Sequence, residues 1–357
     1  MRVLVAMSGG VDSSVSAALV RDRGDEAVGV TLRLWGGESD SGCCSVSDVD
    51  DARRVADRLG IEHHVFNFAD EFDRHVVAPY IEDHRQNRTP NPCVECNRHL
   101  KFDALLTRAD ALGFDAVATG HHARRVGTRD GGWRIARGAD ASKDQSYVLY
   151  PLAGAALARV RFPLGAMTKV DVRRMAATLG LRTASKPDSQ DVCFVTRAQG
   201  RATFLGRRIP LRPARVVDRD GETVGRVDAI ELVTLGQRRG LELAGGPGRR
   251  FVVAIEADHA EGPTVVVGDE SDLLTSAVEV RQVVWADGAS SHVPVDGGVG
   301  LRVEAQCSAH GPAEPATATT IADGVVRVEW DRPRRRVACG QSVVLYEGDQ
   351  VIAGGVV

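Results

Sequence analysis

Three cysteines in two short polar segments have the residue types best suited to covalent chemistry. Cys93 and Cys96 form a Cys-x-x-Cys pair within residues 89–98, TPNPCVECNR, and Cys193 lies in residues 188–194, DSQDVCF. The prolines predict a rigid, non-helical approach to the pair, and a cysteine on a loop near basic residues readily forms the nucleophilic thiolate. We therefore expect thiol chemistry, for which the fold must unite Cys193 with the pair.

The segment SGGVDSS at residues 8–14 is a second reactive candidate, and it directly follows the apolar run Arg2–Met7. Its two glycines let the backbone curl with N–H groups pointing inward, and the start of a following helix adds a positive dipole end. The serines offer hydroxyl donors, and Asp12 can cap the helix or help hold Mg²⁺. No lysine follows the glycines, so this is not a Walker loop. The segment is therefore more typical of a site that binds the departing pyrophosphate than of a serine-capped turn without a ligand.

The elements around these residues alternate between strand and helix along the first part of the chain. Apolar spacing predicts strands and helices, in chain order, at Arg2–Met7, Ser13–Arg23, Ala27–Leu34, Asp48–Leu59, Glu62–Phe68, Phe102–Leu112 and Ala116–Thr119. Such alternation is typical of a parallel α/β sheet. The SGGVDSS loop then lies between the first strand and the first helix.

The pattern changes after about residue 200, where helical periodicity fades. Short β-branched runs separated by turn signals follow at Ala214–Val217, Phe251–Ile255, Pro263–Val267, Ala277–Trp285, Val299–Gln306, Gly324–Trp330 and Ser342–Tyr346. We expect two small β-rich or barrel domains, divided near residues 268–274. The predicted organisation is a catalytic domain at 1–200, a central β domain at 201–270 and a C-terminal β-barrel at 271–357.

Composition sets limits on the class of protein. The chain has 357 residues, 43% hydrophobic and 26% charged, which suggests two or three globular domains. The net charge of −3 shows no overall basic excess, although local arginine clusters leave a basic face open. No run approaches the roughly 18 apolar residues of a membrane helix, and the start lacks a signal-peptide pattern. We expect a cytoplasmic protein without a membrane partner, whose seven cysteines are not a disulfide framework.

Eight internal segments and the C-terminal residues together resemble the tRNA-specific 2-thiouridylase family, a branch of the PP-loop ATP pyrophosphatase superfamily. In chain order they are SGGVDSS (8–14), RTPNPCVECN (88–97), KF (101–102), ATGHHAR (118–124), KDQSYVLY (143–150), FPLGAMTK (162–169), DSQDVCF (188–194), LGQRRGL (235–241) and GGVV (354–357). The resemblance covers essentially the whole chain. It implies a PP-loop, adenine nucleotide α-hydrolase-like domain that uses ATP and Mg²⁺.

The resemblance implies ATP-dependent 2-thiolation of the wobble uridine, position 34, of tRNA. The uridine 2-oxygen attacks the α-phosphate of ATP, and a persulfide sulfur on Cys193 then displaces AMP from the activated carbon. Cys96 is implied as the nucleophile that releases the sulfur and ends in a transient disulfide with Cys193. The implied partners are tRNAs for Glu, Gln and Lys, and a persulfide-donating sulfurtransferase or cysteine desulfurase.

The resemblance also implies which residues contact the two substrates. For ATP they are Ala6, Met7, Ser8, Gly9, Gly10, Val11, Asp12 and Ser13, with the main chain at Leu32 and Gly120 near the adenosine. For tRNA they are Asn91, Pro92 and Cys93 at the target base, and Lys143, Asp144 and Gln145 elsewhere on the RNA.

Two positions depart from the family pattern. Many relatives have Asp where Cys93 stands, so an acid–base role is not carried over. Cys93 instead makes, with Cys96 and Cys193, a set of three thiols. Such a set suits a [4Fe-4S] cluster with one open iron, or a structural zinc ion with His99 as a further ligand. Relatives often show Arg-Tyr in the last barrel where residues 306–310 read QCSAH, so no tRNA contact is assigned there.

Two other functions remain open from sequence. Another PP-loop synthetase would form its product through an adenylate, and a non-catalytic ATP-binding module would respond to ATP by changing conformation. Either would keep the phosphate loop, but neither would need Cys96 and Cys193.

Overall fold

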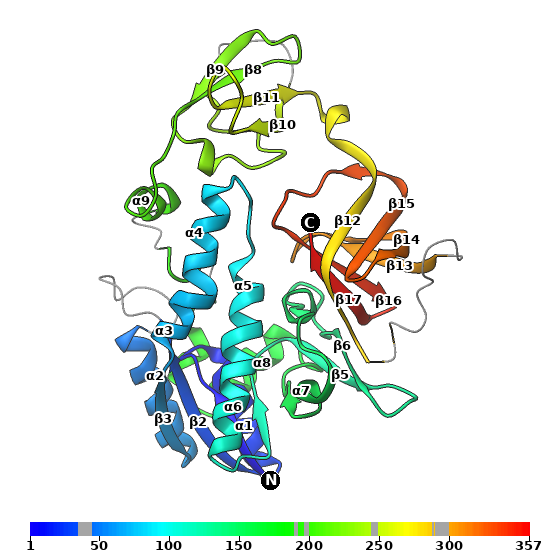
Figure 1. The fold of residues 1–357 in the computed structure, drawn as a ribbon. Helices are drawn as coiled ribbons and strands as arrows, with labels where there is room; N and C mark the ends of the chain where they lie inside the picture. The colour runs from blue at the N-terminus through cyan, green and yellow to red at the C-terminus, as the bar shows by residue number, and fades with distance from the viewer. Residues whose placement is uncertain (35–44, 189–191, 196–199, 244–248, 288, 290–299) are drawn as a thin grey trace.

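A parallel sheet forms the base of the N-terminal part. The computed structural model describes residues 1–34, 45–188, 192–195, 200–243, 249–287, 289 and 300–357 (Figure 1). The sheet order is β3-β2-β1-β4-β7, and every pairing is parallel. The strands are β1 (Arg2–Ala6), β2 (Glu26–Arg33), β3 (Glu62–Asn67), β4 (Ala116–Ala118) and β7 (Val160–Arg161). The predicted parallel α/β domain is confirmed.

Helices α1 (Val11–Asp22), α2 (Val46–Leu59) and α8 (Lys169–Thr178) share one hydrophobic cluster with alternate residues of β1. In α2 the buried residues recur at helical spacing, so one stripe faces the sheet. Shorter helical segments link the remaining elements of this part, namely η3 (Ser146–Leu149), α7 (Gly154–Ala158), η4 (Arg182–Ser185) and α9 (Gly200–Gly206). None of the described helices is both long and apolar enough to span a bilayer.

Two longer helical runs rise beside each other from the sheet (Figure 1). Each is interrupted by a π-helical segment, which is a frequent feature of functional sites. The first comprises α3 (Ala69–Phe72), η1 (Asp73–Val77) and α4 (Ala78–Arg85), and the second α5 (Pro92–Glu95), η2 (Cys96–Ala104) and α6 (Leu105–Ala111). The rings of His75 and His99 stack between the π segments, with centroids 4.6 Å apart.

The second run corrects the sequence prediction of a loop around the cysteines. Cys93 lies in α5 and Cys96 begins η2, well before the predicted helix start at Phe102. Pro92 occupies the first helical turn, where its missing N–H has no partner to lose and its fixed φ favours the helix. The proline therefore begins the helix that carries both cysteines.

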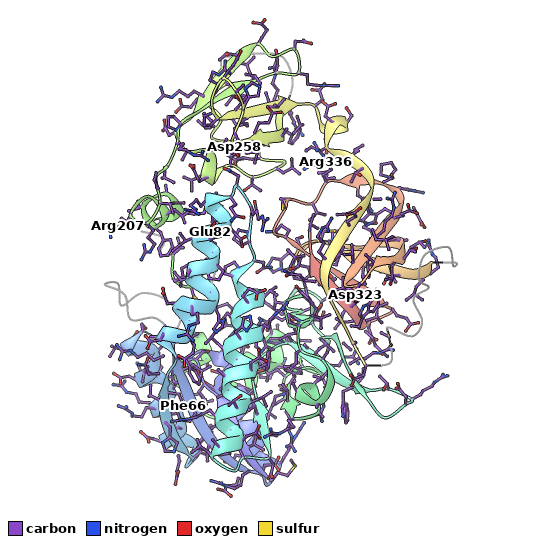
Figure 2. The ribbon with its side chains drawn as sticks, in the orientation of Figure 1. Phe66, Glu82, Arg207, Asp258, Asp323 and Arg336 are labelled. Carbon is purple, nitrogen blue, oxygen red and sulfur yellow. The ribbon has the colours of Figure 1, made fainter. Side chains whose placement is uncertain are left out.

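The central β part is a four-stranded sheet with a core of its own. Its order is β10-β11-β8-β9, formed by β8 (Ala214–Val217), β9 (Thr223–Val227), β10 (Phe251–Glu256) and β11 (Thr264–Gly268), with the 3-10 segment η5 (Ile230–Leu232). The segment η6 (Glu270–Leu273) leads to the last part. Arg336, labelled in Figure 2, connects the central sheet with the last part. Its Nη2 lies 2.5 Å from the carbonyl oxygen of Val253.

The C-terminal part is a closed six-stranded barrel, because β12 pairs with both β15 and β17. Its strands are β12 (Leu274–Trp285), β13 (Leu301–Gln306), β14 (Ala313–Ala322), β15 (Val325–Arg335), β16 (Ser342–Glu347) and β17 (Gln350–Val356). A hairpin of the N-terminal part, β5 (Ala123–Gly127) and β6 (Trp133–Arg137), extends this sheet where Gln350 of β17 pairs with Ala136. The predicted β-rich second half is confirmed.

Candidate active site

The loop between β1 and α1 depends on a glycine. Gly9 has a φ of +71°, which disfavours any side chain, and a methyl group there would lie 2.3 Å from the carbonyl oxygen of Asp48. The N-cap of α1 is Gly10, which has no side chain to cover the first N–H groups of the helix. Those N–H groups and the helix dipole suit an anion at this point.

Serine hydroxyls order the loop from within. The Ser8 N–H donates to Ser13 Oγ at 3.1 Å. The hydroxyls of Ser13 and Ser14 donate to the Gly10 carbonyl oxygen at 3.1 Å and 2.8 Å. Ser13 and Ser14 are buried and Ser8 is exposed, so only Ser8 has its side chain at the surface for a ligand.

Two predicted nucleotide positions flank this loop on the neighbouring strands. Leu32 is a buried residue of β2, and Gly120 follows β4. A methyl group on Gly120 would lie 2.7 Å from the backbone nitrogen of Ser13, so that segment passes directly against the start of α1. The structure thus places both positions at the carboxyl ends of the strands beside β1, where open α/β sheets bind their ligands.

Asp12, in the first turn of α1, has a cationic partner from a distant helix. Lys169 Nζ lies 2.8 Å and 2.7 Å from the two carboxylate oxygens of Asp12, and His122 Nε2 lies 3.2 Å from Oδ1. The Lys169 side chain is only 10% exposed. Burial opposes ionisation of Asp12, but the hydrogen bonds with His122 and Lys169 outweigh it and lower the pKa.

The same lysine connects the phosphate loop to the segment that leads to Cys193. Lys169 Nζ is 2.8 Å from Asp188 Oδ1, and Asp188 also pairs with Lys143 and Arg173, each at 2.8 Å. Burial would raise the Asp188 pKa, but the hydrogen bonds with Lys143 and Lys169 outweigh it and lower it to about 2. Three cations and two carboxylates thus converge beside the start of α1.

The segment 143–145, predicted to touch tRNA, is only partly open. Asp144 accepts hydrogen bonds from the Gly138 N–H at 2.9 Å and from the Ser146 hydroxyl at 2.7 Å, and its side chain is 8% exposed. The Gln145 amide oxygen accepts from the His122 N–H at 2.9 Å. Asp144 and Gln145 thus stabilise their own surroundings, whereas Lys143 is 40% exposed.

The two cysteine segments pack on one hydrophobic cluster although they are far apart in the chain. Cys96 is a buried member of that cluster, and the partly buried Cys193 packs against it. The ring of the neighbouring Phe194 packs on aromatic rings of the first helical run, with ring centroids 5.7 Å from Phe72 and 5.1 Å from Tyr80. In contrast Cys93 is exposed, at the start of the second run.

Family models match the chain in three consecutive stretches. They are described as the tRNA methyl transferase HUP domain (1–197), the tRNA methyl transferase PRC-barrel domain (202–269) and the aminomethyltransferase beta-barrel domain (275–357). The tRNA-specific 2-thiouridylase MnmA of Moorella thermoacetica is 43% identical over 364 residues, covering 99% of this chain and 98% of that protein. The chain belongs to the tRNA-specific 2-thiouridylase family. The 2-thiouridylase of Chloroflexus aurantiacus is 45% identical over 359 residues, covering 99% and 97% of the two chains.

More distant likenesses exist among solved structures. The U34-tRNA thiolase NcsA from Methanococcus maripaludis is 19% identical, with a TM-score of 0.37 over 53% of this chain and 60% of that one. A 4-thiouridine synthetase in complex with RNA and bound ATP is 19% identical, with a TM-score of 0.39 over 58% of this chain and 50% of that one. These TM-scores are too low to bear on the chemistry of this chain.

Lys169 and Asp188 are two candidate site residues that the sequence prediction missed. Lys169 ends the segment FPLGAMTK and Asp188 begins DSQDVCF, so both stood inside recognised motifs. Their charges were the available signal, since an isolated lysine beside an apolar segment needs an anionic partner if it is buried. The pairing itself depends on the tertiary fold.

The described thiols are not grouped with other side chains in the arrangement of a metal site. Within the described ranges, no three His, Cys, Asp or Glu side chains are placed to hold a metal ion. The [4Fe-4S] site at Cys93, Cys96 and Cys193 and the zinc site with His99 stay predictions, which an assay of bound metal tests. The residues 189–191 of the DSQDVCF motif lie outside the described part.

The Asp188 ion pairs make a pH-dependent contribution to the stability of the protein. Because the folded pKa of about 2 is below the ordinary 3.8, the contribution is complete above about pH 4 and disappears as pH falls through 2. We expect Asp188→Asn to reduce the free energy of unfolding on the order of 1–2 kcal/mol at pH 6, after solvent screening. Urea unfolding at several pH values measures the difference, which should narrow below about pH 4. A difference independent of pH would contradict this origin.

Proposed function

We propose that this chain is an ATP-dependent tRNA-uridine 2-sulfurtransferase that thiolates the wobble uridine at position 34. The observation that carries the proposal is that the N-terminal part combines a glycine loop suited to an anion, at the start of α1, with Cys96 and Cys193 on a shared core. A synthetase or an ATP-sensing module would use the loop but not the two cysteines. The relatives that align with 99% of the chain are named for this activity.

ATP is proposed to bind across the carboxyl ends of β1, β2 and β4. The loop Ala6–Ser13 would hold the phosphates, and the backbone at Leu32 and Gly120 would border the adenosine. Lys169 would supply the cation that a Walker loop carries within itself, since its Nζ already lies at the start of α1. Asp12 would be the carboxylate for Mg²⁺, which would neutralise phosphate charge when bound.

The reaction then follows from an improved leaving group. The uridine 2-oxygen attacks the α-phosphorus, the bond to the β-phosphate breaks, and pyrophosphate leaves into the loop. The terminal sulfur of the Cys193 persulfide attacks C2, and AMP departs with its electron pair. The Cys96 thiolate attacks the inner sulfur of Cys193, which leaves the outer sulfur on C2 as the thiocarbonyl and forms a Cys96–Cys193 disulfide. An external dithiol reductant restores both thiols.

The target base is proposed to meet the start of α5, at Asn91, Pro92 and Cys93, with further RNA contacts at Lys143, Asp144 and Gln145. The Lys143 side chain is 40% exposed, which suits a phosphate contact. The substrates are proposed to be tRNAs for Glu, Gln and Lys, and the sulfur donor a persulfide-bearing sulfurtransferase or cysteine desulfurase. The thiolation reaction is proposed to take place in the cytoplasm.

The domain limits proposed are 1–200 for catalysis, 201–270 for the central β domain and 271–357 for the barrel. Two separate hydrophobic clusters support the last two units, since one lies within residues 214–267 and the other within 280–353.

The test is a thiolation assay on protein purified without oxygen. The protein is assayed for iron and zinc, then given ATP, Mg²⁺, a persulfide donor and unmodified tRNA, and product nucleosides are scored for 2-thiouridine. Thiolation by metal-free protein supports the proposal. Activity that rises and falls with bound iron would instead assign the three thiols to a [4Fe-4S] cluster. ATP binding without any thiolation would favour the synthetase or the ATP-binding module.

A further inference from the structure

A turn of the C-terminal barrel, residues 338–341, contacts the segment that leads to the cysteines (Figure 1). The Thr89 N–H donates to the Cys339 carbonyl oxygen at 2.7 Å, and Gln341 Nε2 donates to the Thr89 carbonyl oxygen at 2.5 Å. Gly340 has a φ of +90°, and a methyl group there would lie 3.2 Å from the Thr89 backbone. Both backbone polar groups of Thr89, just before α5, are thus satisfied by the barrel.

The 338–341 turn is itself fixed by the end of the barrel sheet. The Gly340 N–H donates to the Val357 carbonyl oxygen at 2.8 Å, and the Val357 N–H donates to the Gln341 carbonyl oxygen at 2.9 Å. Backbone hydrogen bonds therefore fix the turn to the barrel, and Thr89 bonds to an ordered part of the barrel.

A second connection runs from the barrel to η3. The Tyr147 hydroxyl donates to the Ser342 carbonyl oxygen at 2.8 Å, and the hydroxyls of Ser146 and Tyr346 lie 3.0 Å apart. All four residues are buried. Burial without these partners would cost each polar group its hydration, so the hydrogen bonds fix η3 against β16.

The η3 segment in turn contacts the helix directly after Cys96. The Asn97 side chain is buried, and its Nδ2 donates to the Val148 carbonyl oxygen at 3.1 Å. Barrel residues Val344 and Tyr346 belong to the same hydrophobic cluster as Cys96. The barrel thus contacts the cysteine segment on both sides, at Thr89 before it and through η3 after it.

We propose that the barrel positions the cysteine helix for catalysis and that Gln341 is a positioning residue for Cys96. The inference rests on the proposed function for the reaction that Cys96 performs. A nucleophile must lie within a fraction of an ångström of its productive place, and a displacement of about 1 Å can cost a hundredfold in rate. Two described hydrogen bonds join Thr89 to residues 338–341. One is between backbone groups, and the other comes from the Gln341 side-chain amide, so a substitution of Gln341 can remove it.

Gln341→Ala is compared with Gln350→Ala, a glutamine of the same barrel and of similar partial exposure. In Gln341→Ala we expect amide hydrogen exchange of residues 88–97 and N-ethylmaleimide labelling of Cys96 to become at least several-fold faster. We also expect kcat for thiolation to fall about ten- to hundredfold with KM for ATP unchanged. Gln350→Ala should match the unchanged protein in each measurement.

Unchanged exchange and labelling in Gln341→Ala would overturn the inference, and so would faster exchange with an unchanged kcat. Gln341→Glu keeps the side-chain size but replaces the donor with a carboxylate facing the Thr89 carbonyl oxygen. It should show the same effects, which guards against a folding defect peculiar to the alanine variant. Exchange and labelling require no turnover. If the unsubstituted protein does not thiolate tRNA but Gln341→Ala exchanges its amides faster, the proposed function is contradicted and the barrel contact is still supported.

Discussion

Replacing Cys193 with Ser is expected to reduce 2-thiouridine formation by more than about a thousandfold while ATP binding stays unchanged. A serine hydroxyl cannot carry a persulfide, so the activated uridine has no sulfur to attack it. The side chain packs on the cluster that includes Cys96 and is remote in sequence from the phosphate loop, so the nucleotide site should survive. A single-turnover assay with sulfur-labelled donor measures the loss.

The matched control is Cys307→Ser, at a thiol of the barrel. Burial raises the pKa of Cys307 to about 11, so it stays protonated near neutral pH and unreactive. We expect this variant to keep thiolation activity. Substantial thiolation by Cys193→Ser would contradict the persulfide assignment.

The mechanism gives Cys96→Ser a different outcome from Cys193→Ser. Without the Cys96 thiolate, C2 of the uridine should stay joined to Cys193 through a disulfide. A tRNA–protein adduct that dithiothreitol releases as 2-thiouridine should then accumulate on a denaturing gel. An adduct of equal yield in Cys193→Ser would show that the sulfur resides elsewhere.

The phosphate loop could be predicted from sequence because its determinants are local. A buried strand, the glycines at 9 and 10, and a helix start lie within a few consecutive residues, and the φ of +71° at Gly9 shows why that residue is glycine. The parallel sheet followed from the alternation of periodicities. Both conclusions depend on neighbours in the chain, which a sequence displays directly.

The surroundings of the cysteines could not be predicted because they depend on contacts between distant segments. The prolines before Cys93 suggested a loop, yet Pro92 begins a helix that packs beside the run 69–85. The 69–85 run itself escaped prediction, and so did the hairpin 123–137 that extends the barrel sheet. The hairpin extends the barrel sheet through its pairing with the distant strand β17, whereas Pro92 in the first turn of α5 was a local sign of a helix start that the sequence prediction missed.

Replacing Lys169 is expected to weaken ATP binding, because this lysine is the centre of a charge network beside the phosphate loop. Lys169→Met removes the cation shared by Asp12 and Asp188 and leaves two carboxylates next to the proposed phosphate site. A hydrogen bond to a charged group contributes about 1.5–3 kcal/mol, so we expect KM for ATP to rise about ten- to hundredfold. Isothermal titration with a non-hydrolysable ATP analogue gives the affinity independently of turnover.

The contrast with other cations on α8 decides whether the effect comes from Lys169 itself. Arg174 lies on the same helix with its side chain 70% exposed and paired with Asp171, so Arg174→Met should leave ATP affinity nearly unchanged. Lys169→Arg keeps the charge and should recover part of the affinity. If Lys169→Met binds the analogue as tightly as the unchanged protein, the phosphate charge is neutralised elsewhere, and the Lys169 pairs serve only to join α1 to the segment before Cys193.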